Sequence, residues 1–246
     1  MRFKCSPIKS PWLTASLMTV GVWIGGTSLP AQAETFVEES GTIIPAEHSY
    51  NFEGTSGQAI TITLESEDFD PVLVLTDSAG NELATNDDFG GTLNSTIIVT
   101  LPKQDTYTVV ARSFAGQGGD YQVMVRTSTP YEVAYGEGQA LSQESDFEGA
   151  IAAYTKAIGI DEEQPSAYLG RAEATLGQIY AEQGENISGP QDIPEATREA
   201  IIVDFEKAAD LIEALGNQDW AASLREQANY LREGDSSSEE TPSGGM

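Results

Sequence analysis

Four aspartates have the residue type and spacing that could bind a metal ion. Asp68 and Asp70 precede an apolar run, and Asp87 and Asp88 lie in a polar segment further along the chain. Calcium takes several oxygen ligands at about 2.3–2.6 Å, so these carboxylates would suit it if the fold gathered them at one end. The alternative is turn chemistry, in which Asp caps backbone N–H groups in loops. We expect no cofactor and assign no metal ligand, and we keep these four aspartates as calcium candidates.

Catalytic signatures are missing from the sequence. It has no HExxH, GxSxG, phosphate-binding loop or CxxC motif. The single histidine, His48, lies in a strand-like stretch with no second histidine to complete a metal site, and no motif supports it as the base of a serine triad. In a chain with 39 acidic residues, pairs of carboxylates are to be expected and give no evidence for a hydrolytic site. We therefore expect no catalytic residue and no enzyme.

The charge of the chain excludes two classes of partner. Its 246 residues include 39 Asp and Glu against 12 Lys and Arg, which gives a formal net charge of −27. Nucleic-acid binding needs Lys and Arg to replace counterions, and a polybasic attachment to anionic lipid needs them too. A neutral or basic polypeptide is the partner that electrostatics favours. One cysteine allows no intrachain disulfide.

Residues 1–33 have the pattern of a secretory signal peptide. A basic start is followed by an apolar stretch, and Ala31-Gln32-Ala33 fits the small-x-small cleavage rule. Cleavage between Ala33 and Glu34 would leave 9 basic and 39 acidic residues, a net charge of −30. We expect export to a periplasmic, extracellular or other lumenal compartment, with no stable membrane insertion after cleavage. The alternative is an uncleaved signal anchor.

Residues 34–130 alternate between apolar and polar side chains with a period of two and are broken by frequent turn residues. This pattern predicts β-strands of a sandwich or barrel. The predicted strands are 41–44, 48–52, 59–64, 71–76, 82–85, 95–101, 106–112 and 121–126. The run 71–76 is apolar throughout, which predicts a strand buried on both faces.

The residues of this segment resemble the bacterial pre-peptidase C-terminal domain. The motifs that carry the resemblance occur in this order: Phe52-x-Gly54, Gly57-Gln58-x-Ile60-x-Ile62-x-Leu64, Asp68-Phe69-Asp70-Pro71-x-Leu73-x-Leu75-x-Asp77, Gly80-Asn81-x-Leu83-Ala84-x-Asn86-Asp87-Asp88, Ser95-x-Ile97, Thr100-Leu101-Pro102, Thr106-Tyr107 and Gly119-x-Tyr121. The resemblance implies a small antiparallel, jelly-roll-like β-sandwich of about eight strands. It also implies a non-catalytic module of secreted bacterial proteins that aids secretion, folding or substrate attachment. We expect the aromatic residues Tyr50, Tyr107, Phe114 and Tyr121 in its core or corners.

Residues 131–232 change to a helical period. Phe147, Ile151, Tyr154 and Ile158 recur on one face of a helix, and Ser145 to Glu148 has the pattern of a capping box at its start. A shorter helix upstream, over 135–142, completes a helical hairpin.

This hairpin resembles the tetratricopeptide repeat. Ala134 and Tyr168 are 34 residues apart, as are Gly138 and Ala172, and 34 residues is the period of that family. Its small residues are matched by Gly138, Ala150 and Ala157. The pairs Lys156-Ala157 and Lys207-Ala208 are 51 residues apart, so about 17 residues are inserted in the second repeat, with a loop near 184–192. A last helix over 219–232 caps the stack, and 233–246 is predicted to be a disordered acidic tail.

The sequence thus predicts an all-β module followed by an all-α module, acting as an exported, non-catalytic protein-binding or scaffold protein. By helical spacing, six residues of the first helices would line a groove: Tyr135, Gln139, Ser142, Leu169, Glu173 and Leu176. The alternative for Tyr135, Leu169 and Leu176 is packing against a neighbouring helix. Because two hairpins are few, we expect the helices to pack on the sandwich, to form a homodimer, or to be marginally stable.

Two other functions stay open from the sequence. One is a cell-envelope or extracellular attachment module that binds polysaccharide or protein, with or without calcium. The other is an accessory subunit of a secreted peptidase.

Overall fold

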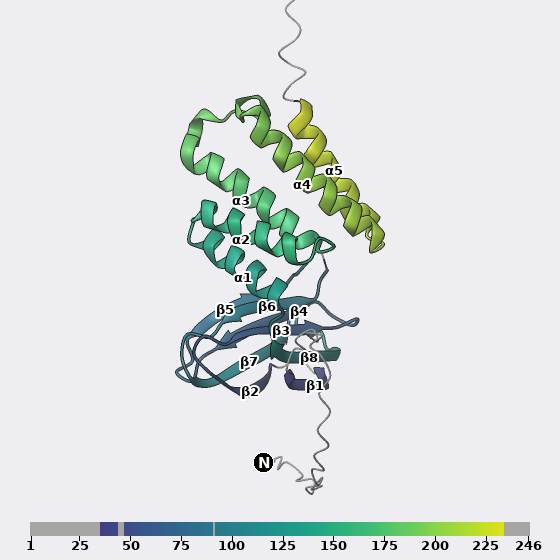
Figure 1. Cartoon of the computed structure of the whole chain (residues 1–246). Helices are drawn as coiled ribbons and strands as arrows, with labels where there is room; N and C mark the ends of the chain where they lie inside the picture. Colours follow the sequence, from purple (N-terminus) through teal and green to yellow (C-terminus); the bar gives the residue numbers. More distant parts are fainter. Residues whose placement is uncertain (1–34, 44–46, 91, 234–246) are drawn as a thin grey trace, which may run out of the picture. The chain divides into compact units, whose positions relative to one another are not determined.

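The computed structural model describes residues 35–43, 47–90 and 92–233 (Figure 1). The predicted signal peptide with its cleavage site at Ala33 and Glu34, and the predicted tail beyond residue 233, lie outside the described residues. The elements are β1 Thr35–Ile43, β2 His48–Gly54, β3 Ala59–Glu65, β4 Pro71–Thr76, β5 Glu82–Asn86, β6 Ser95–Thr100, β7 Asp105–Ser113, β8 Gly119–Thr127, α1 Pro130–Gln143, α2 Phe147–Ile160, α3 Pro165–Gln183, η1 Gly184–Asn186, η2 Pro190–Asp192, α4 Glu195–Ala214 and α5 Gln218–Glu233.

The strands form two antiparallel four-stranded sheets, in the orders β1-β8-β3-β6 and β2-β7-β4-β5. In each sheet, strands from the start of the module lie next to strands from its end. This is the connectivity of a jelly roll, and it confirms the predicted sandwich. The first strand is longer than predicted: β1 begins at Thr35 and pairs with β8 from there to Ile43. It is an edge strand with largely exposed side chains, so it lacks the alternation that reveals the other strands.

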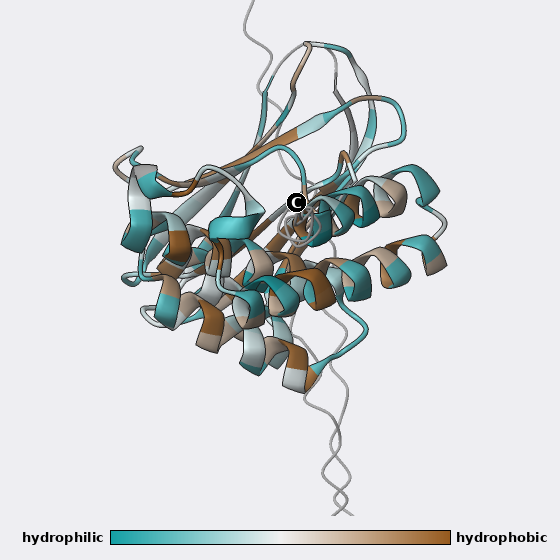
Figure 2. Cartoon of the chain, turned by 90° about the horizontal axis from the view of Figure 1, so that it is seen from above, coloured by the Kyte–Doolittle hydropathy of each residue, from teal (hydrophilic) through white to brown (hydrophobic). Residues whose placement is uncertain are grey.

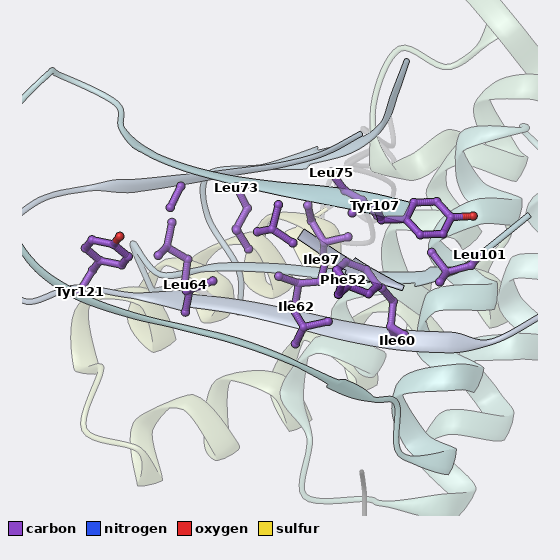
Figure 3. Close-up of a cluster of buried hydrophobic side chains, with 14 of the residues drawn as sticks. Phe52, Ile60, Ile62, Leu64, Leu73, Leu75, Ile97, Leu101, Tyr107 and Tyr121 are labelled. Atoms are coloured by element: carbon purple, nitrogen blue, oxygen red, sulfur yellow. The ribbon is translucent and has the colours of Figure 1, made fainter. Parts of the chain in front are cut away.

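The core of the sandwich lies between the two sheets and contains the inward residues of the alternating pattern (Figure 3). Ile60, Ile62 and Leu64 from β3 face Leu73 and Leu75 from β4 across it, and all five are fully buried. Val74, between the latter two, is buried as well, so this part of β4 is covered on both faces as its apolar run predicted.

The helices pack in sequence, α1 on α2, α2 on α3, α3 on α4 and α4 on α5. Figure 2 shows that hydrophobic and hydrophilic residues alternate along them. Tyr154 of α2 lies where α1 and α3 carry glycine: a Cβ on Gly138 would come within 2.7 Å of its ring, and one on Gly170 within 2.5 Å. These two positions therefore let three helices meet around one aromatic side chain.

The start of α1 is the best-capped helix end, and the sequence did not single it out. Thr129 Oγ1 accepts the N–H of Glu132, and the Glu132 carboxylate accepts the N–H of Thr129 at 2.7 Å, which completes a capping box. The predicted box at Ser145 is wrong: Ser145 has a φ of 62°, and the N-cap of α2 is Asp146. Ser145 makes the left-handed turn between the helices, so it is not the capping residue.

The helices also contact the sandwich, one of the three outcomes expected from the small number of hairpins. Arg126 at the end of β8 donates to both carboxylate oxygens of Glu132, at 2.6 and 2.7 Å. Phe89 packs edge-on against Tyr135 of α1, with ring centroids 5.7 Å apart, and Gly136 lies against Ile98 of β6. Over the part of the chain that the structure describes, no helix is long and apolar enough to cross a bilayer.

We expect Gly170→Ala to lower the free energy of unfolding by about 1–3 kcal/mol, because the added methyl group overpacks against Tyr154. Gly159→Ala on α2 is the matched control: nothing lies within 4 Å of its new Cβ, so the variant should gain about 0.4–1 kcal/mol. Urea denaturation followed by helical circular dichroism measures both changes. If the two variants have equal free energies of unfolding, the packing of Tyr154 does not require the absence of a side chain at position 170.

We expect the sandwich to lose stability in acid through the turn after β4. Hydrogen bonds from Asn81, and then from Lys103, lower the pKa of Asp77 from 3.8, while hydrogen bonds from Ser78 and Lys103 lower the pKa of Asp105 to about 2. The unfolded chain therefore takes up protons first, and the free energy of unfolding should fall as pH drops from about 4 through 2. In acid titrations, Asp77→Asn should weaken the dependence of the unfolding free energy on pH. Glu67→Gln, which alters an exposed side chain of the same sandwich, should leave this dependence unchanged.

Candidate functional site

One of the four calcium candidates has a structural contact of its own. Asp68 Oδ2 accepts the N–H of Asp120 at 2.7 Å, so this carboxylate holds the start of β8. Burial, and then the charges of Asp88 and Asp87, raise the pKa of Asp70. Among the described residues, no group of three or more His, Cys, Asp or Glu side chains is arranged to hold a metal ion. The four aspartates stay calcium candidates, and no such group is formed by them.

His48 belongs to a polar cluster inside the sandwich. Its Nδ1 is 2.6 Å from the hydroxyl of Tyr121, which also hydrogen bonds to the hydroxyl of Tyr50. Burial, and then the contact with Tyr50, raise the pKa of Tyr121. The cluster ties β2 to β8, a structural role. Phe114 corrects a prediction: it is 68% exposed in the turn after β7, so it lies outside the core and corners.

Three of the six predicted groove residues gather around Tyr154. Tyr135 is buried and packs on the rings of Tyr131 and Tyr154, with centroids 5.9 and 5.6 Å away, so it lies in the core and lines no groove. Ser142 is half-buried beside Tyr154. Glu173 is exposed, yet desolvation of its carboxylate raises its pKa, and its charge in turn helps to raise the pKa values of Tyr135 and Tyr154.

The other three predicted groove residues lie apart. Gln139 lines a cavity between α1 and the β6 region. Leu169 is half-buried and packs into the core shared by α3, α4 and α5, which is the alternative that the sequence left open. Leu176 lines a different cavity, and this one has the composition of a binding site.

We call that cavity the tyrosine-rimmed groove. It has a volume of about 510 Å³ and is lined by Leu176, Tyr180, Ile187, Ser188, Gly189, Pro190, Ile193, Phe205, Ser223, Glu226, Gln227, Tyr230 and Leu231. Ile193, Phe205 and Leu231 are buried and form its apolar floor. Tyr180 of α3 and Tyr230 of α5 are 54% and 60% exposed, although both are large aromatic residues. The groove thus combines an apolar base with an aromatic rim.

Helical spacing and the inserted segment together build the groove. Leu176 and Tyr180 are four residues apart on α3, and Ser223, Gln227 and Tyr230 follow at four and three residues on α5, so each set lies on one helix face. The remaining wall is the segment between α3 and α4, which the sequence predicted as an insertion. Gly184, with a φ of 54°, ends α3 and lets the chain turn into this segment.

Two charged side chains hold the inserted wall in place. Arg198 of α4 is buried, and its Nη1 donates to the carbonyl oxygens of Pro190 at 3.0 Å and Ile193 at 3.4 Å. The Asp192 carboxylate accepts the N–H groups of Ser188 and Gly189 at 2.7 and 3.3 Å. Buried polar groups are tolerated when they are hydrogen bonded in this way, so the wall is a built part of the fold.

The lining of the groove has few groups that could take part in a reaction. Its ionisable side chains are Glu226 and the two tyrosines, and its hydroxyls belong to these tyrosines and to Ser188 and Ser223. No histidine, cysteine, lysine or arginine is among these lining residues, so Glu226 is the one residue of the lining with a formal charge at neutral pH. Exposed aromatic side chains over an apolar floor are typical of interaction surfaces.

Sequence reasoning did not find Tyr180 or Tyr230. On the packing face of the last helix, Leu224, Ala228 and Leu231 are buried, while Trp220 is half-buried. Tyr230 falls outside that face. A large aromatic residue on the polar side of an amphipathic helix was the available signal.

Solved structures with some likeness to the chain are distant from it. They include the pre-peptidase C-terminal domain of a collagenase from Bacillus anthracis (18% identity, covering 37% of this chain and 88% of that one, TM-score 0.33). A periplasmic inhibitor of g-type lysozyme, PliG from Aeromonas hydrophila, has 13% identity over 40% of this chain and 94% of that one, with a TM-score of 0.33. A Bacillus licheniformis lipase in propeptide form has 15% identity over 48% of this chain and 27% of that one, with a TM-score of 0.30.

The family comparison is specific to the sandwich. No curated protein matches the chain. Residues 46–113, which run from the start of β2 through β7, match the family model of the bacterial pre-peptidase C-terminal domain. This match confirms the resemblance for that segment.

Proposed function

We propose that the chain is an exported, non-catalytic polypeptide-binding protein. In this proposal the helices α1–α5 supply the binding surface, and the sandwich is an accessory module. The observation that carries it is the tyrosine-rimmed groove, where Tyr180 and Tyr230 are exposed above an apolar floor. Tyrosine is enriched among the residues that dominate binding energy at protein interfaces.

The arrangement of the helices supports a scaffold of the tetratricopeptide type. The hairpins α1–α2 and α3–α4 pack one after the other, and Ala134 and Tyr168, 34 residues apart, are both buried. Gly138 and Ala172, the second pair with this spacing, are buried as well. In such stacks each hairpin buries its apolar face against the next, and exposed faces are left to bind partners. The inserted wall between α3 and α4 deepens the groove that these helices form with α5.

The double variant Tyr180→Ser/Tyr230→Ser tests this function. Peptides selected from a random displayed library against the full chain should bind the double variant at least about tenfold more weakly, because two aromatic anchors are lost. Titration calorimetry with the selected peptides measures the affinities. Phe114→Ser is the matched control, since it removes an exposed aromatic residue from the sandwich.

Selection of no peptide, or equal affinities for the double variant and the wild type, would contradict the proposal. Concentration-dependent light scattering of the same samples reports whether the groove is instead covered by a second copy in a homodimer.

The exposed Phe114 favours a second candidate function, attachment to the cell envelope or an extracellular surface. An aromatic side chain that is 68% exposed in a turn is a ready platform for a polysaccharide ring or an apolar side chain.

Phe114→Ser should reduce co-sedimentation of the full chain with insoluble bacterial envelope material, with Tyr180→Ser/Tyr230→Ser as the control. Repeating the co-sedimentation in the presence of a calcium chelator shows whether calcium contributes to the attachment. Unchanged sedimentation of Phe114→Ser would remove this candidate. An accessory role beside a secreted peptidase is compatible with either surface.

A further inference from the structure

We infer that the tyrosine-rimmed groove takes a positively charged polypeptide segment, with an apolar side chain on the floor and Lys or Arg side chains at the rim. This inference rests on the proposed function and adds the chemistry of the partner. Three features of the groove support it: the composition of its lining, the charge state of the helices around it, and the nature of its rim.

The lining carries negative charge and no positive charge. Glu226 is exposed at the α5 side of the groove, and no lysine or arginine is among the lining residues. Arg198 contacts the lining residues Pro190 and Ile193, but it is buried, and there it donates to main-chain carbonyl groups. The carboxylate of an acidic peptide would therefore lie near Glu226, and no cationic side chain of the lining would offset the repulsion between the two charges.

The surrounding helices add to this negative charge. Residues 165–233 contain 13 acidic and 5 basic residues, a net charge of −8. The arginines of these helices already donate to acceptors: Arg171 to Asp204, Arg198 to Pro190 and Ile193, Arg225 to Asp210 and Glu213, and Arg232 to Glu206. The unneutralised excess leaves a negative potential that attracts cationic segments and repels anionic ones.

The rim favours cations on separate grounds. A guanidinium or ammonium group over the face of a tyrosine ring gains a cation–π interaction, and Tyr180 and Tyr230 are both exposed enough to offer a face. The floor formed by Ile193, Phe205 and Leu231 meanwhile accepts an apolar side chain. A segment that alternates apolar and basic residues fits both parts, whereas a uniformly basic segment leaves the floor empty.

Three synthetic peptides with identical leucine positions test the inference. Their remaining positions are lysine in the first, glutamine in the second and glutamate in the third. In titration calorimetry with the full chain, the lysine peptide should bind about tenfold more tightly than the glutamine peptide, and the glutamate peptide should bind most weakly. The preference should shrink at higher salt, because the groove is open to solvent and its charges are screened.

Glu226→Gln separates a local contact from the charge of the whole chain. It should reduce the preference for the lysine peptide about threefold, whereas Glu199→Gln, which removes an exposed carboxylate from α4 outside the groove, should leave it close to wild type. Equal effects of the two variants would overturn the inference, since they would show that only net charge matters.

The remaining outcomes distinguish this inference from the proposed function. If the lysine and glutamine peptides bind equally and Tyr180→Ser/Tyr230→Ser weakens both, the charge preference is wrong while polypeptide binding in the groove stands. If no peptide shows tyrosine-dependent binding, both are wrong.

Discussion

The ring of Tyr154 can lie between α1 and α3 only because positions 138 and 170 carry no side chain. Small residues at a helix contact let backbones approach closely, and here one aromatic side chain uses the space on both sides. The same principle recurs where Gly177 of α3 lies against Phe147. The position of α3 follows from these contacts, and α3 carries Leu176 and Tyr180 to the groove. The contacts of α3 with Tyr154 and Phe147 thus help to set the geometry of the groove that Leu176 and Tyr180 line.

The groove is also a consequence of the interruption between α3 and α4. A regular hairpin would close this space with a short turn, whereas residues 184–194 form a wall whose carbonyl groups are held by the buried Arg198. A buried guanidinium is tolerated because main-chain acceptors replace its water. The inserted segment is therefore a built wall of the groove, and its apolar residues Ile187 and Ile193 are among the lining residues.

Charge acts on this protein at two scales. Over the whole chain, the excess of acidic residues is spread through the sandwich and the helices, so it marks no single site. Near the groove, the arginines of α3–α5 donate to other acceptors, and Glu226 is left exposed among the lining residues. The proposed preference for a cationic segment and the expected exclusion of nucleic acid would have the same electrostatic origin.

Local patterns in the sequence predicted much of the secondary structure. Alternation predicted seven strands of the sandwich closely, helical periodicity predicted the first hairpin and the last helix, and ordered motifs predicted the pre-peptidase C-terminal resemblance that residues 46–113 confirm. These features depend on neighbours along the chain. The tertiary fold was needed to show that Tyr135 is buried against Phe89, that Phe114 is exposed, that Asp68 accepts a main-chain N–H at the start of β8, and that Tyr180 and Tyr230 share one groove. Each of these depends on contacts between residues far apart in sequence, which periodicity within one element does not specify.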